Sequence, residues 1–131
     1  MKKVLIVDDE PLNVKLLAAI LPRDQYDMIF AYNGEEALAK VAEEVPDLIL
    51  LDVMMPGISG YDVCSQLKSK EETRLIPVVL VTALDDSESR IKGIEAGADD
   101  FVSKPPNRSE LLARVKSLIR VKSLNSRLTS I

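Results

Sequence analysis

Residues 47–57 read DLILLDVMMPG: four consecutive large aliphatic residues lie between two aspartates, and a proline and a glycine follow. An unbroken aliphatic run of this length is typical of a short strand buried on both faces. The proline and glycine indicate a turn soon afterwards. Asp52 is therefore expected at the carboxyl end of a central strand, the edge where ligands bind in open α/β sheets. Taken alone, Asp52 is more simply interpreted as a turn residue that ends a strand.

Apolar runs of strand length alternate with segments of helical spacing along the whole chain. The expected strands cover residues 3–7, 26–31, 48–51, 76–81 and 99–103, and the expected helices cover about 11–21, 35–44, 61–69, 87–96 and 108 onward. Such alternation implies right-handed βαβ units. We therefore predict one doubly wound α/β domain with five parallel strands and helices on both faces. The order of the strands does not follow from this periodicity.

Local signals indicate how several of these helices begin and end. Asp8 or Asp9 is expected to cap the first helix, and the Asp85-Asp86-Ser87 run the fourth, because side-chain oxygens accept the free N–H groups of a first turn. Val45 continues the apolar spacing of helix 35–44 just beyond its end. Cys64, on the third helix, is expected to be a small buried or half-buried hydrophobic residue.

Composition excludes several classes of function. With 131 residues, the chain has the size of one domain, and its 21 acidic and 17 basic residues give a net charge of −4, which does not suit direct nucleic acid binding. The absence of histidine excludes histidine-based catalysis and most zinc sites. One cysteine cannot form an internal disulfide, and no apolar run has the roughly 20 residues of a membrane helix. We expect a soluble, cytoplasmic protein that does not contact a membrane.

Polar residues follow four of the five expected strands: Asp8 and Asp9, Asp52, Thr82 and Lys104. Parallel strands place all of these ends on one edge of the sheet. Carboxylates that converge there repel one another, and an oxygen-coordinated divalent cation such as Mg²⁺ relieves the repulsion. An aspartate can also attack a phosphoryl donor to form an aspartyl phosphate. Taken separately, Lys104 is a surface lysine and Thr82 a β-branched strand residue, but together at matching strand ends they indicate phosphoryl chemistry.

Several motifs resemble those of the receiver domains of two-component response regulators. They are Val-Asp-Asp at 7–9, Leu-Leu-Asp-Val-Met-Met-Pro at 50–56, Gly60, Val-Thr-Ala at 81–83, Gly97-Ala98-Asp99 and Lys104-Pro105. The resemblance covers nearly the entire chain and implies a flavodoxin-like sheet with strand order 2-1-3-4-5. It also implies that a histidine kinase or phosphotransfer protein phosphorylates Asp52.

The resemblance implies a role for each residue of the acidic edge. Asp9 and Asp52 would bind Mg²⁺ together with the main-chain carbonyl of Met54, and Asp8 would contact the ion mainly through water. The chain would then be a phosphoacceptor and not an enzyme. Its only intrinsic reactions would be autophosphorylation from small donors and autodephosphorylation.

Other family positions are assigned to transmission of the signal. Thr82 and Lys104 would hold the phosphoryl oxygens, Ala83 would leave access to them, and Phe101 would be the aromatic switch residue. The Lys104-Pro105 peptide bond is expected to be cis. The family more often has a large apolar residue where this chain has Pro106. This departure affects only where the last helix is expected to start. The output surface would be the fourth helix, fifth strand and fifth helix.

The last helix continues beyond the usual end of a receiver. We predict a receiver over residues 1–120 and a helical extension, a linker, over 121–131. Val121, Leu124, Leu128 and Ile131 form a heptad-like seam, which suits a linker to an output domain or pairing in a homodimer formed on phosphorylation, with a frayed tail as the alternative. Residues 53–56 and 112–118 resemble receivers that precede diguanylate cyclase domains. The basic residues of this helix, namely Arg114, Lys116, Arg120, Lys122 and Arg127, are expected to form a solvated face, with a nucleic acid patch as the alternative.

Three other functions compete with a phosphorylation switch as interpretations of the sequence. An aspartyl-phosphate phosphatase usually needs a second aspartate two residues after the nucleophile, where this chain has Met54. A flavin-binding domain needs a phosphate-cradling loop, and none follows Val7. A protein-binding receiver module that works without phosphorylation remains as the alternative.

Overall fold

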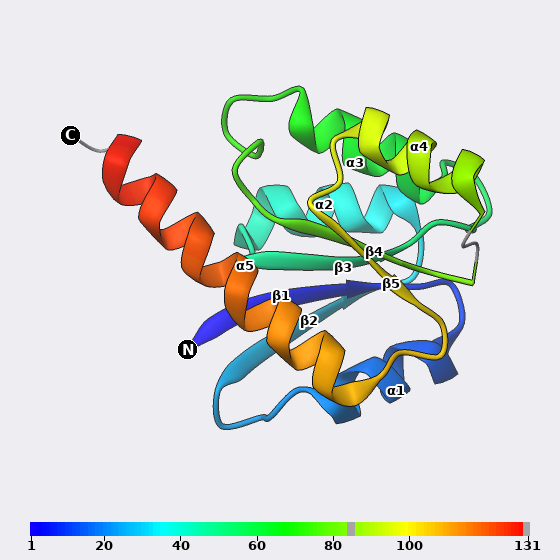
Figure 1. Ribbon diagram of the computed structural model, residues 1–131, viewed down its shortest axis with the longest axis horizontal. Coiled ribbons are helices and arrows are strands. Elements are labelled where there is room, and N and C mark those ends of the chain that lie inside the picture. The colour runs from blue at the N-terminus through cyan, green and yellow to red at the C-terminus, as the bar shows by residue number, and fades with distance from the viewer. Residues whose placement is uncertain (84–85, 130–131) are drawn as a thin grey trace.

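The computed structural model describes residues 1–83 and 86–129, with the side chains of the last helix described as far as Leu124. Five parallel strands form one sheet in the order β2-β1-β3-β4-β5. They are β1 (Lys2–Val7), β2 (Tyr26–Ala31), β3 (Leu48–Asp52), β4 (Val78–Thr82) and β5 (Asp100–Ser103). The helices between and after them are α1 (Pro11–Ile20), α2 (Gly34–Glu44), α3 (Gly60–Lys68), α4 (Ser87–Ala96) and α5 (Arg108–Thr129). The predicted doubly wound fold and its strand order are confirmed (Figure 1).

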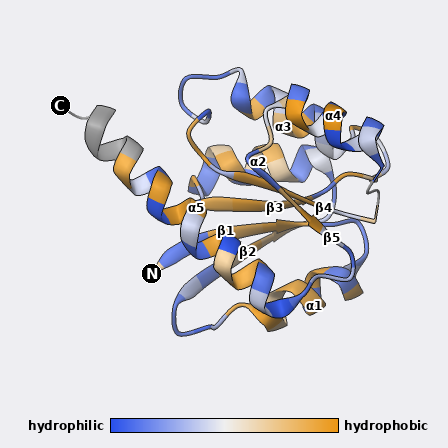
Figure 2. Cartoon of the chain, viewed as in Figure 1, coloured by the Kyte–Doolittle hydropathy of each residue, from blue (hydrophilic) through white to orange (hydrophobic). Residues whose placement is uncertain are grey.

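Two helical layers enclose the sheet. Helices α1 and α5 pack on one face with β3 residues Leu48 and Leu50. Helices α2 and α3 and the end of α4 pack on the other face, with Ile49 and Leu51. Because successive residues of β3 point to opposite cores, every position of this strand must be apolar until Asp52 is reached. The hydropathy colouring shows the same concentration of hydrophobic residues in the sheet (Figure 2).

The boundaries of the elements lie within one or two residues of the expected ones. Strand β4 begins at Val78 because Pro77, just before it, has no N–H to give to the ladder. Asp86 caps α4, as expected, by accepting a hydrogen bond from the Ser89 backbone at 2.7 Å. Helix α5 begins at Arg108, and the Asn107 side chain accepts the backbone N–H of Glu110 at 2.9 Å.

The predicted cap of α1 is wrong. Glu10 is the residue before the helix, and no side chain caps it. Asp8 instead accepts the backbone N–H of Glu10 at 3.0 Å, one residue too early to reach the first helical turn. The Asp8 carboxylate is therefore held at the sheet edge by the loop that leads into α1.

The structure does not continue the apolar face of α2 to Val45. Helix α2 ends at Glu44, and the Val45 backbone takes a φ of 24°, with its N–H donated to the Val41 carbonyl. The side chain is 59% exposed. The helical spacing therefore stops one residue before Val45, because the chain must turn into Pro46.

Cys64 is fully buried, as predicted, and its thiol contacts the carbonyl oxygen of Ala96 at 3.5 Å. Burial raises the pKa of this thiol to about 11, so the thiol is protonated at neutral pH. None of the helices in the described part of the chain is long and apolar enough to span a membrane.

Helix α5 runs past the sheet without a break and leaves it near the start of β1 (Figure 1). Val121 and Leu124 of the heptad-like seam are about half exposed. The Leu128 side chain and Ile131 lie outside the described residues. The Lys122 ammonium lies 3.4 Å from Oδ1 of Asp47, just before β3. The extension is therefore tied to the amino edge of the sheet.

Candidate functional site

The register of the sheet brings the predicted site residues together. Val7 pairs with Leu51, and Asp52 pairs with Val81. Asp8, Asp52 and Thr82 therefore end adjacent strands at nearly the same level. Their side chains and that of Lys104, from the loop after β5, line one cavity of about 240 Å³. The residues that line this cavity are Asp8, Asp9, Glu10, Asn13, Asp52, Met54, Thr82, Ala83 and Lys104.

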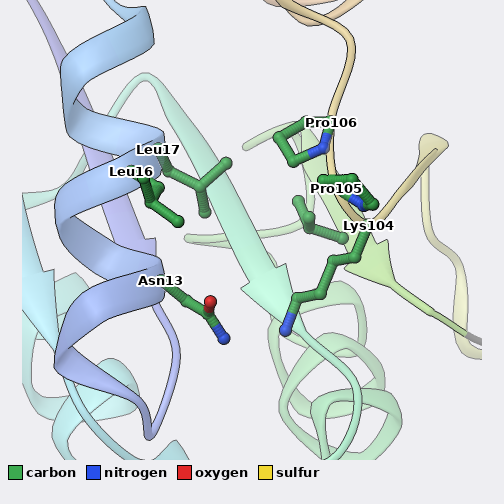
Figure 3. A pocket seen from close by; sticks show the side chains of 7 residues that line it. Asn13, Leu16, Leu17, Lys104, Pro105 and Pro106 are labelled. Atoms are coloured by element: carbon green, nitrogen blue, oxygen red, sulfur yellow. The ribbon is translucent and has the colours of Figure 1, made fainter.

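Two lining residues, Glu10 and Asn13, were not predicted. Glu10 continues the acidic run that begins at Asp8, and Asn13 follows three residues later, so that one helical turn brings it to the same side of α1. That spacing is the signal that could have identified both residues. Asn13 and Lys104 extend into the same space from opposite sides (Figure 3).

Lys104 is the cation at the centre of this site. Its backbone N–H donates to the Thr82 carbonyl at 3.0 Å, which continues the β4–β5 ladder by one residue and fixes where the side chain starts. The ammonium lies 2.8 Å from Oδ2 of Asp8 and 2.9 Å from Oδ1 of Asp52. Both carboxylates are nearly inaccessible to solvent. One amine therefore lies between two buried carboxylates.

The balance of burial and charge decides the protonation of this cluster. Burial raises the pKa of Asp52, the Lys104 hydrogen bond and charge oppose the rise, and Asp8 and Asp9 reinforce it. Burial alone would lower the pKa of Lys104, but the hydrogen bonds and the negative charges of the two carboxylates together outweigh burial and raise it. Lys104 therefore offsets only part of the cost of charging Asp52.

The acidic side chains fit a hard divalent cation. Carboxylate oxygens of Asp8, Asp9 and Asp52 all lie within 4.8 Å of one another. Mg²⁺ is usually held by one or two carboxylates plus water and phosphoryl oxygens, so this donor set has the right chemistry. The charge of a bound cation would also relieve the carboxylate repulsion that Lys104 only partly offsets.

The residues assigned to switching lie in two places. Thr82 and Ala83 line the acidic cavity, and the Lys104-Pro105 peptide bond is cis. Phe101 lies outside the cavity and packs on the α4 side of the sheet, where the place of a Gly93 Cβ would be only 2.2 Å from the ring. The guanidinium of Arg90 lies 5.6 Å from the centre of the same ring.

A second cavity of about 230 Å³ adjoins the acidic one and shares two of its residues, Asn13 and Lys104. It is apolar and lies between α1 and the loop after β5 (Figure 3). Leu16 lines it and is 55% exposed, and Leu12, one helical turn earlier, is 65% exposed. An apolar surface therefore borders the acidic cavity.

Sequence comparison matches residues 4–116 to the response regulator receiver domain family. The chain is 52% identical over 120 residues to the response regulator PleD of Caulobacter vibrioides, which covers 92% of this chain and 26% of that protein. It is 46% identical over 119 residues to the alkaline phosphatase synthesis transcriptional regulatory protein PhoP of Bacillus subtilis, covering 91% of this chain and 49% of that protein. The chain therefore spans about a quarter to a half of these relatives.

Solved structures give the same result. The receiver domain of a signal transduction histidine kinase from Syntrophus aciditrophicus superimposes with a TM-score of 0.85 at 38% identity, covering 92% of this chain and 91% of that chain. The chemotaxis protein CheY4 of Vibrio cholerae superimposes with a TM-score of 0.84 at 29% identity, covering 90% of this chain and 98% of that chain.

Proposed function

This chain belongs to the response regulator receiver domain family, and we propose that Asp52 is the residue that accepts the phosphoryl group. The observation that carries the proposal is the convergence of Lys104 on Asp52 at 2.9 Å, at the end of the central strand. Asp52 lies between the strands that end at Asp8 and Thr82, so acidic and hydroxyl groups flank it. Asp8 also contacts Lys104, but its other oxygen is engaged by the Glu10 backbone.

The proposed reaction transfers a phosphoryl group to a carboxylate oxygen of Asp52. A new P–O bond forms to Asp52, while the bond from phosphorus to the donor breaks and the donor leaves with its electron pair. A histidine kinase or phosphotransfer protein would present a phosphohistidine, and acetyl phosphate would present an acyl phosphate. The Lys104 ammonium and the Thr82 hydroxyl, which line the same cavity, would hold the phosphoryl oxygens.

Asp9 and Asp52 would hold Mg²⁺ with the main-chain carbonyl of Met54, and Asp8 would contact it mainly through water. The ion would supply positive charge for the transferring phosphoryl group. The chain's own residues do the rest: they position the carboxylate, and Ala83 leaves the phosphoryl group accessible. We propose no turnover beyond autophosphorylation from small donors and autodephosphorylation.

The proposed signal is a redistribution of contacts around the new phosphoryl group. It adds about 1.5 to 2 negative charges and three acceptor oxygens. Contacts from Thr82 and Lys104 would then favour a different arrangement of the loops after β4 and β5, and the Phe101 ring would follow. The surface formed by α4, β5 and α5, with Ile91 and Ile94 exposed at 52% and 64%, would transmit the change to an output domain, a partner or a second copy.

We propose that residues 1–120 are the receiver and that residues 121–131 are a linker. The chain spans only 26% of PleD and 49% of PhoP, and a linker would join the receiver to a further domain such as those relatives have room for. We also propose a cytoplasmic location, because the chain would have to meet its phosphorelay partner there.

Intact-mass measurement after incubation with acetyl phosphate and Mg²⁺ tests the proposal. The wild type is expected to gain one phosphoryl group, and Asp52→Asn and an EDTA-treated sample none. Asp27→Asn, an exposed carboxylate of β2, is the matched control and should react like the wild type. An adduct that persists in Asp52→Asn would assign the acceptor elsewhere. No adduct in the wild type, with Mg²⁺ binding shown separately, would favour a binding module that works without phosphorylation.

A further inference from the structure

The basic residues of α5 do not form one solvated face. Arg114 pairs with Asp100 and Glu110, and Lys122 pairs with Asp47. Lys116 and Arg120, whose side chains are also described, differ from them. Within the described part of the chain neither has an ion-pair partner.

Lys116 and Arg120 are one helical turn apart and line the same groove of about 400 Å³, together with Lys2 at the start of β1. All three cations are exposed, and Lys2 also lacks an ion-pair partner among the residues that the structure describes. Gln25 and Ser123 add polar groups, while Tyr26 and Ile119 form a buried apolar floor. The groove lies at the amino edge of the sheet, where β1 begins beside the middle of α5, away from the acidic cavity at the carboxyl edge (Figure 1).

This local charge contrasts with the rest of the molecule. The chain carries a net charge of −4, yet the described residues that line the groove include three cations without an ion-pair partner and no carboxylate. The nearest acidic residues in sequence, Asp24 and Asp27, flank Gln25 and Tyr26 but form no ion pair with the three cations in the described structure. Clustering like charges without partners is unfavourable for the free protein, so an anionic ligand would bind with a gain in electrostatic energy.

We propose that this groove binds a short acidic peptide segment of a partner protein, with carboxylates on Lys2, Lys116 and Arg120. Charge and size favour such a segment over nucleic acid. The phosphates of a nucleic acid extend past the groove and are repelled by the net negative charge of the domain. Two or three carboxylates fit within a groove of about 400 Å³ and interact mainly with the cations next to them. The proposal does not depend on phosphorylation of Asp52.

The test uses the full 131-residue chain, labelled with ¹⁵N, and a synthetic hexaglutamate peptide as the probe. Titration is expected to shift the backbone amides of residues 2, 25, 116, 120 and 123 and to weaken as salt is raised. The Lys116→Ala, Arg120→Ala double variant should bind about tenfold or more weakly, because charge-assisted hydrogen bonds are lost. Lys116→Arg keeps the charge and should retain binding. Lys15→Ala removes an exposed cation of α1 outside the groove and should leave binding unchanged.

Each contrary outcome overturns the proposal. Shifts elsewhere, or none at millimolar peptide, would show that the groove is not an acidic-peptide site. Equal weakening by Lys15→Ala would indicate unspecific attraction. A parallel titration with a single-stranded oligothymidylate that bound the same amides more tightly than hexaglutamate would assign the groove to nucleic acid instead.

Discussion

The ammonium of Lys104 lies 2.9 Å from Oδ1 of Asp52, and this contact joins the loop after β5 to the end of the central strand. The same ammonium lies 2.8 Å from Oδ2 of Asp8. Three strands of the sheet are thus connected at their carboxyl ends by one amine. A phosphoryl group on Asp52 would compete for that amine, which gives the proposed switch a physical starting point.

Removing this amine should affect reactivity more than folding. In Lys104→Gln the rate of phosphorylation by acetyl phosphate at saturating Mg²⁺ is expected to fall about 10²-fold, as when one preorganised donor is lost from an active site. Lys15→Gln, an exposed lysine of α1, is the control and should keep the wild-type rate. The rate is followed by intact mass against time. A Lys104→Gln rate within twofold of the wild type would contradict the assigned role.

The raised pKa of Asp52 has a consequence for stability. Because the folded protein holds this proton more tightly than the unfolded chain does, Asp52 destabilises the fold at pH values above its folded pKa and ceases to do so as the pH falls through the unfolded value. Asp52→Asn, with EDTA present, is therefore expected to have a higher urea midpoint at pH 7. The advantage should shrink as the pH is lowered toward the ordinary aspartate pKa of about 4. A urea midpoint of Asp52→Asn no higher than that of the wild type at pH 7 would contradict this explanation.

Periodicity predicts the layers and the acidic edge of this fold because both depend on local patterns: aliphatic runs, and a polar residue directly after each. It does not predict the strand order, which depends on pairings between distant segments. Periodicity also cannot predict that Lys104 contacts both Asp8 and Asp52, because Asp8 is 96 positions away in the sequence. The basic residues of α5 look alike in sequence, but Arg114 and Lys122 pair with Asp100 and Asp47, which are distant in the chain.

Close packing behind Asp52 makes Gly60 sensitive to substitution. A Cβ at Gly60 would lie 2.2 Å from the Asp52 carbonyl oxygen, and backbone atoms cannot move aside easily. Gly60→Ala is expected to lower the free energy of unfolding by about 1–3 kcal/mol. Gly57→Ala meets no atom within 4 Å but has a φ of +81°, so its cost should be smaller, about 1 kcal/mol. Urea unfolding measures both, and a larger cost at Gly57 would contradict this explanation.

The strained end of α2 offers a stabilising change. Val45 has a φ of 24°, which a β-branched residue adopts at a cost, and its side chain is largely exposed. Val45→Gly is expected to raise the free energy of unfolding by about 0.5–1 kcal/mol, the relief of strain exceeding the added freedom of the unfolded chain. Val45→Ala keeps the unfavourable φ and should gain less. A loss of stability in the glycine variant would show that the Val45 side chain contributes packing.

The contact between Gly93 of α4 and the Phe101 ring can be measured by a double-mutant cycle. The place of a Gly93 Cβ is 2.2 Å from the Cζ of Phe101 and 3.0 Å from Leu80 Cδ1, so Gly93→Ala must displace the ring. We expect a loss of about 1–3 kcal/mol in the free energy of unfolding. In the Phe101→Ala background the obstructing ring is absent, and the same substitution should cost little or even stabilise α4, since alanine favours helix over glycine by about 1 kcal/mol.

The coupling energy from these four proteins, obtained by urea unfolding, is expected to be about 1–2 kcal/mol. An equal cost of Gly93→Ala in both backgrounds would mean that the ring does not resist the new methyl group. The cycle also bears on the proposed switch. If Phe101 moves when Asp52 is phosphorylated, Gly93→Ala displaces the ring beforehand, and the ¹H shifts of the Phe101 ring should then change less on phosphorylation than in the wild type. If the ¹H shifts of the ring change as much in the variant as in the wild type, the position of the Phe101 ring is not part of the signal.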